Sequence, residues 1–179
     1  MNTKQLETIM WMDRITATEF QGVFPSDEMP DHVDIFPSAY IANVDPSDQP
    51  GSHWVAMYFT KEGKAEFWDS YGQSPQLYSR TFQDFLDRNS NYWIMSHTVL
   101  QSLDSSVCGE YCIYYLVHRC RGFSLSTIVN HFTQRKRIND SIVYEFAKRH
   151  YPSVFMRDKK RAAVKQQSSK SQFKNKTTL

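Results

Sequence analysis

The sequence predicts an α+β fold in which a small antiparallel sheet is flanked by helices. Aromatic and β-branched runs typical of strands lie in the middle of the chain, and two of them form an evident hairpin. Apolar residues at helical spacing occur near the start of the chain and again after the last expected strand. This order of elements, in a chain of 179 residues, is typical of one α+β domain.

The expected strands are short and close together in sequence. They span residues 38–44, 53–60, 65–69 and 92–100. The second and third form the clearest hairpin, because the Lys-Glu-Gly-Lys segment at 61–64 is a turn between two strand-like runs. By contrast, we expect residues 20–27 to be a loop, since Gly22 and Pro25 punctuate that segment.

The expected helices pack around this sheet. They span residues 3–12, 75–88, 108–121, 124–132 and 140–150. Pro75 suits the first position of the second helix, whose buried side is expected to include Leu77. Gly122 is placed to stop the third helix, and Pro152 follows the last one.

Charge is divided unevenly along the chain. Residues 157–179 contain eight lysines or arginines and one aspartate, whereas residues 1–156 contain thirteen basic and eighteen acidic residues. The last segment also lacks periodicity and is rich in Lys, Gln, Ser and Thr. We therefore expect residues 1–156 to form the domain and residues 157–179 to be a disordered basic tail. Such a tail is either a solvated end or a nonspecific tether for nucleic acid.

We expect a monomer inside the cell, in the nucleus, the cytoplasm or a virion, and not a secreted protein. The sequence contains no run of 18 apolar residues that would predict a membrane span. The first ten residues lack the apolar stretch of a signal peptide. The three cysteines, an odd number, do not suggest a disulfide framework.

One cysteine stands where a nucleophile could be activated. Cys108 begins the third expected helix, and the partial positive charge of a helix N-terminus favours a thiolate. Free thiols have a pKa of about 8.5, which such sites lower to roughly 3.5–7.5. Gly109 would let a substrate backbone approach closely. Taken alone, however, a free cysteine is more often a small apolar core residue.

Three other residues offer the remaining parts of a thiol protease. The hairpin should bring His53 and Asp69 side by side, because its outer ends meet. Asp69 could then orient His53 as the base, while Gln101, seven residues before the cysteine, could donate a hydrogen bond to the oxyanion. Each of them alone also has an ordinary explanation, as a surface histidine, a turn aspartate or a strand-end glutamine. The argument rests on the four residues as an ordered set.

That set resembles the cysteine proteases of the adenovirus type and those that process the ubiquitin-like protein SUMO. The chain contains Gly-Ser-His53-Trp, Phe-Trp-Asp69-Ser-Tyr-Gly, Leu-Gln101-Ser and Cys108-Gly-Glu-Tyr-Cys, in the order of that family. The resemblance covers roughly residues 5–150. It implies a peptidase with His53, Asp69, Gln101 and Cys108 in its site, acting on polypeptides near glycine. It implies no cofactor for the chemistry, but a possible DNA or peptide activator.

The branch of the family stays open. The compact chain and the Cys-Gly-x-x-Cys motif that includes Cys112 look like the adenovirus maturation protease and its counterparts in Maverick-type transposons. Asp69 followed by Ser70 looks like the SUMO branch, yet Val107 stands where that branch usually has Asp. The alternatives are an endopeptidase that matures capsid precursors, an isopeptidase that removes a modifier, a silent binding module, and a nucleic-acid-binding protein that acts through its tail.

The remaining cysteines predict neither a metal site nor a disulfide. Cys108, Cys112 and His118 do not have a recognised zinc spacing. A disulfide between helical positions four apart has poor geometry. We therefore expect Cys112 and Cys120 to be thiols of the core.

Overall fold

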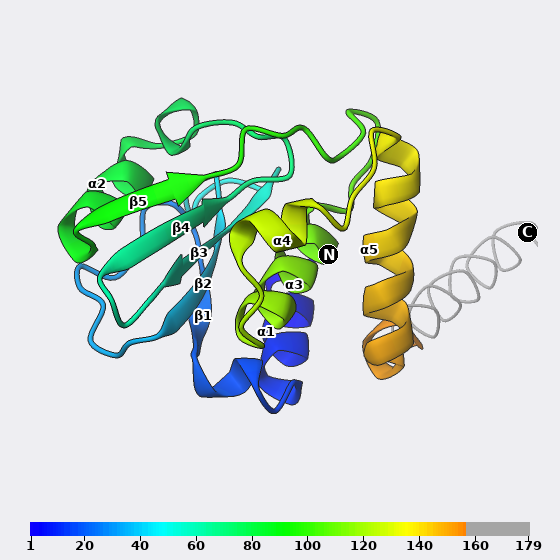
Figure 1. Cartoon of the computed structure of the whole chain (residues 1–179), viewed down its shortest axis with the longest axis horizontal. Helices are drawn as coiled ribbons and strands as arrows, with labels where there is room; N and C mark the ends of the chain where they lie inside the picture. Colours follow the sequence, from blue (N-terminus) through cyan, green and yellow to red (C-terminus); the bar gives the residue numbers. More distant parts are fainter. Residues whose placement is uncertain (157–179) are drawn as a thin grey trace, which may run out of the picture.

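A computed structural model of the chain describes residues 1–156, which form a five-stranded sheet with helices on both faces (Figure 1). The strands, in spatial order, are β1 (Phe20–Phe24), β2 (Ser38–Asn43), β3 (Trp54–Phe59), β4 (Lys64–Trp68) and β5 (Tyr92–Met95). The helices are α1 (Thr3–Met12), α2 (Arg80–Asn89), α3 (Cys108–Arg119), α4 (Leu125–Val129) and α5 (Lys136–His150), with short 3-10 turns η1 (Thr16–Thr18) and η2 (Pro75–Leu77). The tail expected at 157–179 lies outside the described residues.

The α+β class is confirmed, but the sheet is mixed. The central pairs β2–β3 and β3–β4 are antiparallel, as the hairpin predicts. The outer pairs β1–β2 and β4–β5 are parallel, which the expectation of an antiparallel sheet missed. Parallel neighbours need long crossovers, and both outer connections are long: residues 25–37 and residues 69–91, the second of which carries α2.

Three expected elements differ from the structure. Residues 20–24 form β1 and not a loop, and their register shifts between Phe20 and Gly22, as in a β-bulge. The helix expected at 75–88 is divided into η2 and α2, and this leaves Leu77 70% exposed. The strand expected at 92–100 ends at Met95. The other expected strands and helices are present, with ends that differ by a few residues.

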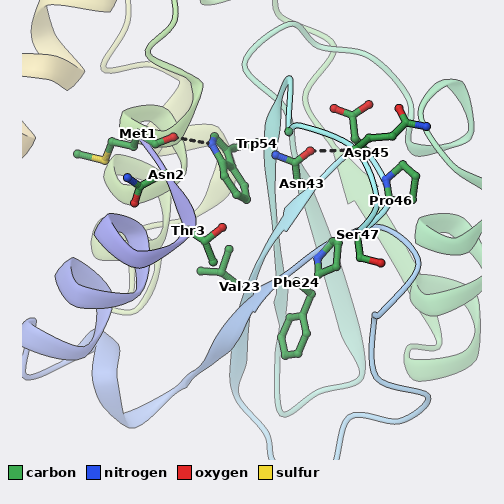
Figure 2. A pocket seen from close by; sticks show the side chains of 13 residues that line it. Met1, Asn2, Thr3, Val23, Phe24, Asn43, Asp45, Pro46, Ser47 and Trp54 are labelled. Atoms are coloured by element: carbon green, nitrogen blue, oxygen red, sulfur yellow. Dashed lines mark hydrogen bonds between the residues drawn. The ribbon is translucent and has the colours of Figure 1, made fainter.

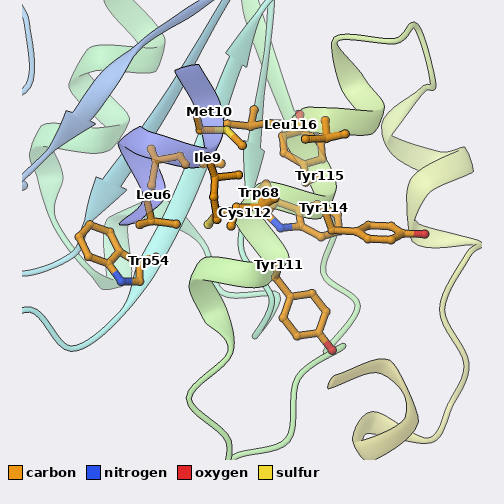
Figure 3. Close-up of a cluster of buried hydrophobic side chains, with 14 of the residues drawn as sticks. Leu6, Ile9, Met10, Trp54, Trp68, Tyr111, Cys112, Tyr114, Tyr115 and Leu116 are labelled. Atoms are coloured by element: carbon orange, nitrogen blue, oxygen red, sulfur yellow. The ribbon is translucent and has the colours of Figure 1, made fainter. Parts of the chain in front are cut away.

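The two faces of the sheet bury separate clusters of side chains. On one face, α2 packs its aromatic side against β2, β3 and β4. On the other face, α1, α3, α4 and α5 cover the sheet, and Trp68 of β4 stacks on Tyr115 of α3 at 4.7 Å between ring centroids. Figure 3 shows Leu6, Ile9 and Met10 of α1 packed with side chains of α3 in this second cluster. The position of α3 across the sheet is therefore fixed by packing along its length.

This packing brings several chain ends to one edge of the sheet. β3 begins where β4 ends, because the two are antiparallel. β1 and β2 also end at this edge, since β2 is antiparallel to β3 and parallel to β1. Three of the candidate catalytic residues from the sequence lie here: His53 just before β3, Asp69 just after β4 and Cys108 at the start of α3.

Candidate active site

The β3–β4 hairpin brings a histidine and an aspartate together. His53 directly precedes β3 and Asp69 directly follows β4. Nε2 of His53 donates a hydrogen bond to Oδ1 of Asp69 at 2.7 Å. Both side chains are buried, with 7% of His53 and 2% of Asp69 exposed. The two residues that the hairpin argument paired therefore form a hydrogen-bonded unit.

Cys108 lies on the other side of the imidazole. It is the first residue of α3, and its thiol lies close enough to the imidazole to raise the pKa of His53. Because Nε2 faces Asp69, Nδ1 is the ring nitrogen that remains for the sulfur. Burial alone would lower the pKa of His53, but the hydrogen bonds and charges of Asp69 and Cys108 outweigh burial and raise that pKa to about 9. The imidazole is thus held as a cation next to a thiol at a helix N-terminus, where peptide dipoles favour negative charge.

The loop after β4 holds the carboxylate of Asp69 in place. Besides His53, three donors contact this carboxylate: the backbone N–H of Tyr71 at 3.1 Å, the backbone N–H of Gln73 at 2.7 Å and the hydroxyl of Tyr78 at 3.0 Å. Hydrogen bonds of this kind fix the orientation of a carboxylate. The sequence analysis did not find these partners, although an Asp followed by Ser-Tyr-Gly signals a turn.

Two aromatic rings cover the imidazole. The ring centroid of Tyr71 lies 4.8 Å from that of His53, and the centroid of Tyr78 lies 5.5 Å away. Both rings are tilted by less than 40° to the imidazole plane. They restrict rotation of His53 and limit the access of water to its bond with Asp69. Both tyrosines belong to the same loop that holds the carboxylate.

Gln101 is fully buried and is oriented by a serine. Its Oε1 accepts a hydrogen bond from Oγ of Ser70 at 2.7 Å, and its Nε2 donates to the backbone oxygen of Ser105 at 3.0 Å. An amide NH₂ group carries two protons, so one N–H remains for another acceptor. The backbone of Gln101 is also tied to Ser70, because its N–H donates to the Ser70 carbonyl at 3.1 Å. Ser70 was noted in the sequence only as a mark of the branch, and its contact with Gln101 was not foreseen.

Gly109 has a different role from the one expected. A Cβ at this position would lie 3.1 Å from Cβ of Met1, 3.2 Å from Cδ2 of Leu6 and 3.5 Å from Cδ1 of Trp54. The space beside the glycine is therefore filled by the protein and is not open to a substrate backbone. Gly109 lets α1 and Trp54 pack closely against the start of α3.

The other two thiols lie in or near the core. Cys112 is fully buried, and burial raises its pKa well above the ordinary value, with the charge of Cys108 adding to the effect. Cys120 is partly buried, and burial likewise raises its pKa. In the described part of the chain, no group of three or more His, Cys, Asp or Glu side chains could hold a metal ion. Within residues 1–156, no helix has the length and apolar character needed to cross a membrane.

Comparison with known proteins finds a similar viral protein. No protein-family model matches the chain. The chain is 32% identical over 124 residues to an Acanthamoeba polyphaga mimivirus protein named "Putative thiol protease R355". The match covers 65% of this chain but only 40% of the mimivirus protein. It confirms the resemblance to viral thiol proteases that the motifs indicate. Among solved structures, the ASFV pS273R protease matches 59% of this chain and 43% of its own, with 20% identity and a TM-score of 0.38.

Proposed function

We propose that this protein is a cysteine-type peptidase whose site consists of Cys108, His53, Asp69 and Gln101. The observation that carries the proposal is the arrangement at one edge of the sheet, where the imidazole of His53 is hydrogen-bonded to the carboxylate of Asp69 and lies next to the thiol of Cys108. A thiol protease needs these three groups in this order. The similarity to the mimivirus protein, whose name includes thiol protease, supports the same chemistry.

Each group has a defined part in the reaction. The thiolate of Cys108 attacks the carbonyl carbon of the substrate, and the developing oxyanion accepts from the Cys108 backbone N–H and the free N–H of Gln101. As the tetrahedral intermediate collapses, the imidazolium of His53 gives its proton to the leaving amine. The neutral imidazole then takes a proton from a water molecule as that water attacks the thioester. The acid product leaves, and the Cys108 thiolate and the His53 imidazolium are restored. Asp69 keeps the ring oriented and stabilises its cationic form.

The resemblance to adenovirus-type and SUMO proteases supports a finer assignment. We propose an intracellular endopeptidase that cuts polypeptides at or near glycine, as in the maturation of a viral or virus-like capsid precursor. The chemistry uses no cofactor, although DNA or a peptide could act as an activator. The basic residues at 157–179 would supply nonspecific contacts to nucleic acid.

The decisive experiment combines a peptide library with a thiol variant. The full chain is incubated with internally quenched peptides that contain glycine, alongside the Cys108→Ala protein and the matched control Cys120→Ala. We expect cleavage by the parent and the control and none by Cys108→Ala. Cleavage by Cys108→Ala would show that another group is the nucleophile. Failure of the parent to cleave any peptide, with no labelling of Cys108 by thiol reagents, would favour a silent binding module.

A second probe separates the two proteolytic alternatives. A ubiquitin-like modifier that ends in a vinyl sulfone reacts covalently with enzymes that bind the modifier's C-terminal tail. Labelling of Cys108 by this probe, together with poor cleavage of short peptides, would favour the deconjugating isopeptidase. Cleavage of short peptides without labelling would favour precursor processing.

A further inference from the structure

A cavity of about 350 Å³ lies beside the candidate active site, at the ends of β1 and β2 (Figure 2). Two of its lining residues, Gly51 and Trp54, flank His53 in the chain. The indole of Trp54 also approaches the Cβ position of Gly109 to 3.5 Å, next to Cys108. Trp54 therefore separates this cavity from the start of α3. Asp69 follows β4, so the cavity and the carboxylate lie on opposite sides of His53 along the sheet edge.

A nearly buried amide is directed into the cavity. Only 6% of Asn43 is exposed, and its Oδ1 accepts from the backbone N–H of Asp45 at 2.9 Å. That bond fixes the amide, and Figure 2 shows its nitrogen pointing toward the neighbouring Trp54. No hydrogen-bond partner for this nitrogen is found within residues 1–156. Gly51 preserves the room beside it, because a Cβ there would lie 2.2 Å from the same nitrogen.

The side chains that line the cavity carry charge of one sign, while the α-amino group of Met1, which acts on Glu110, lies on the side opposite Asp45 (Figure 2). Asp45 lines it, and its Oδ2 accepts from the backbone N–H of Ser52 at 2.6 Å. No lysine, arginine or histidine side chain is among the described residues that line the cavity. The nearby Asp27, bound to Ser47 of the lining, adds a second negative charge. The side of the cavity formed by Asp45 therefore attracts a cation and disfavours an acidic side chain.

The remaining lining suits the stem of a long side chain. Val23 and Phe24 of β1 and the indole of Trp54 supply apolar surface to the cavity. Lysine and arginine bury their methylene stems on such surface and keep the charged end near water or a carboxylate. A free amide N–H2 group, in turn, matches a backbone carbonyl of an extended peptide.

We propose that this cavity binds a lysine or arginine side chain of the polypeptide substrate, a few residues from the bond that is cut. Asp45 pairs with the basic group, and the Asn43 amide donates to a substrate backbone carbonyl. The proposal rests on the proposed peptidase function. Besides glycine at the cleaved bond, a basic side chain would then be a second determinant of substrate specificity. That side chain is part of the same polypeptide substrate.

The test is a positional scan with internally quenched peptides. Each of the four positions on either side of the cleaved bond is varied in turn among Lys, Arg, Gln, Leu and Glu. We expect one position at which Lys or Arg is favoured over Gln by about two- to fivefold in kcat/KM, as for a partly exposed ion pair. The Asp45→Asn protein keeps an oxygen for Ser52 and should lose this preference. Asp48→Asn, an exposed carboxylate of the same loop outside the lining, should keep it.

The outcomes separate this inference from the function on which it rests. If the parent cleaves peptides but favours a basic residue at no position, the cavity has another role and the peptidase function stands. If Asp45→Asn slows every peptide equally, Asp45 only supports the loop beside His53, and the inference is wrong. A charge reversal, Asp45→Lys, should favour Glu at the same position. If the parent cleaves nothing, both proposals fail together. Even if a variant does not fold, the scan of the parent shows whether any substrate position favours a basic residue.

Discussion

Replacing Asp69 by asparagine removes one negative charge from the site with almost no change in volume. The carboxylate accepts four hydrogen bonds, two of them from backbone N–H groups. An amide in either orientation turns its NH₂ group toward one of these backbone donors, so one buried N–H loses its acceptor. We expect Asp69→Asn to fold and to be about 1–3 kcal/mol less stable than the parent.

Replacing Asp69 has its larger effect on the pKa of His53. Its pKa of about 9, against an ordinary 6.5, corresponds to about 3 kcal/mol in favour of the imidazolium, shared between Asp69 and Cys108. Without Asp69, burial lowers this pKa. If half or more of that free energy is lost, kcat/KM falls by roughly 10- to 100-fold. Because the folded-state pKa is raised, the stabilisation is complete below about pH 6.5 and is lost as the pH rises through about 9.

Two measurements across a pH series test this reasoning. The first is the rate at which a small alkylating reagent modifies Cys108, and the second is the free energy of unfolding. In the parent, the imidazolium beside Cys108 should persist up to about pH 9. In Asp69→Asn the imidazolium should lose its proton at a lower pH. The stability difference from the parent should be largest at and below about pH 6.5 and smallest above 9. If His53 lost its proton at the same pH in both proteins, the assignment of Asp69 as the group that sets the charge of His53 would be refuted.

Three further variants test the surroundings of the site. Ser70→Ala should lower kcat by about tenfold with little change in KM, because the amide of Gln101 loses the donor that orients it; steady-state kinetics checks this, and an unchanged kcat would contradict it. Tyr78→Phe should lower the upper pH limit of activity, but by less than Asp69→Asn, since it removes one hydrogen bond and no charge. Gly109→Ala should lower the melting temperature by several degrees, because its Cβ would lie 3.1 Å from Cβ of Met1 and 3.2 Å from Cδ2 of Leu6 in the first helix. A melting temperature equal to that of the parent would show that this N-terminal segment can move aside.

The sequence predicts the parts of this site that depend on local geometry. His53 and Asp69 are sixteen residues apart on one hairpin, so the pairing of its strands alone brings them together. Cys108 is found because a helix begins there, and that beginning is visible in the apolar spacing that follows. Gln101 is located by the resemblance to the protease family, and the structure shows it fully buried.

The parts that the sequence analysis missed depend on contacts between distant segments. The strand at 20–24 pairs with β2 across a long connection, and its Gly and Pro residues suggest a loop to any local argument. Leu77 fits a helical pattern, yet the chain bends between η2 and α2 and leaves it exposed. Likewise, Tyr71 and Tyr78 cover His53 only because the loop after β4 folds back over the hairpin.

The three cysteines show how position selects one nucleophile from chemically identical groups. Cys112 lies one helical turn after Cys108, but it faces the core, and burial raises its pKa well above the ordinary value. The negative charge of Cys108 raises that pKa further, so a second thiolate is disfavoured wherever the first exists. Cys120 is also disfavoured as a thiolate, by burial and by the nearby Glu19. Only Cys108 combines a helix N-terminus with a cationic imidazole, and an alkylating reagent at neutral pH should therefore modify it well before the other two.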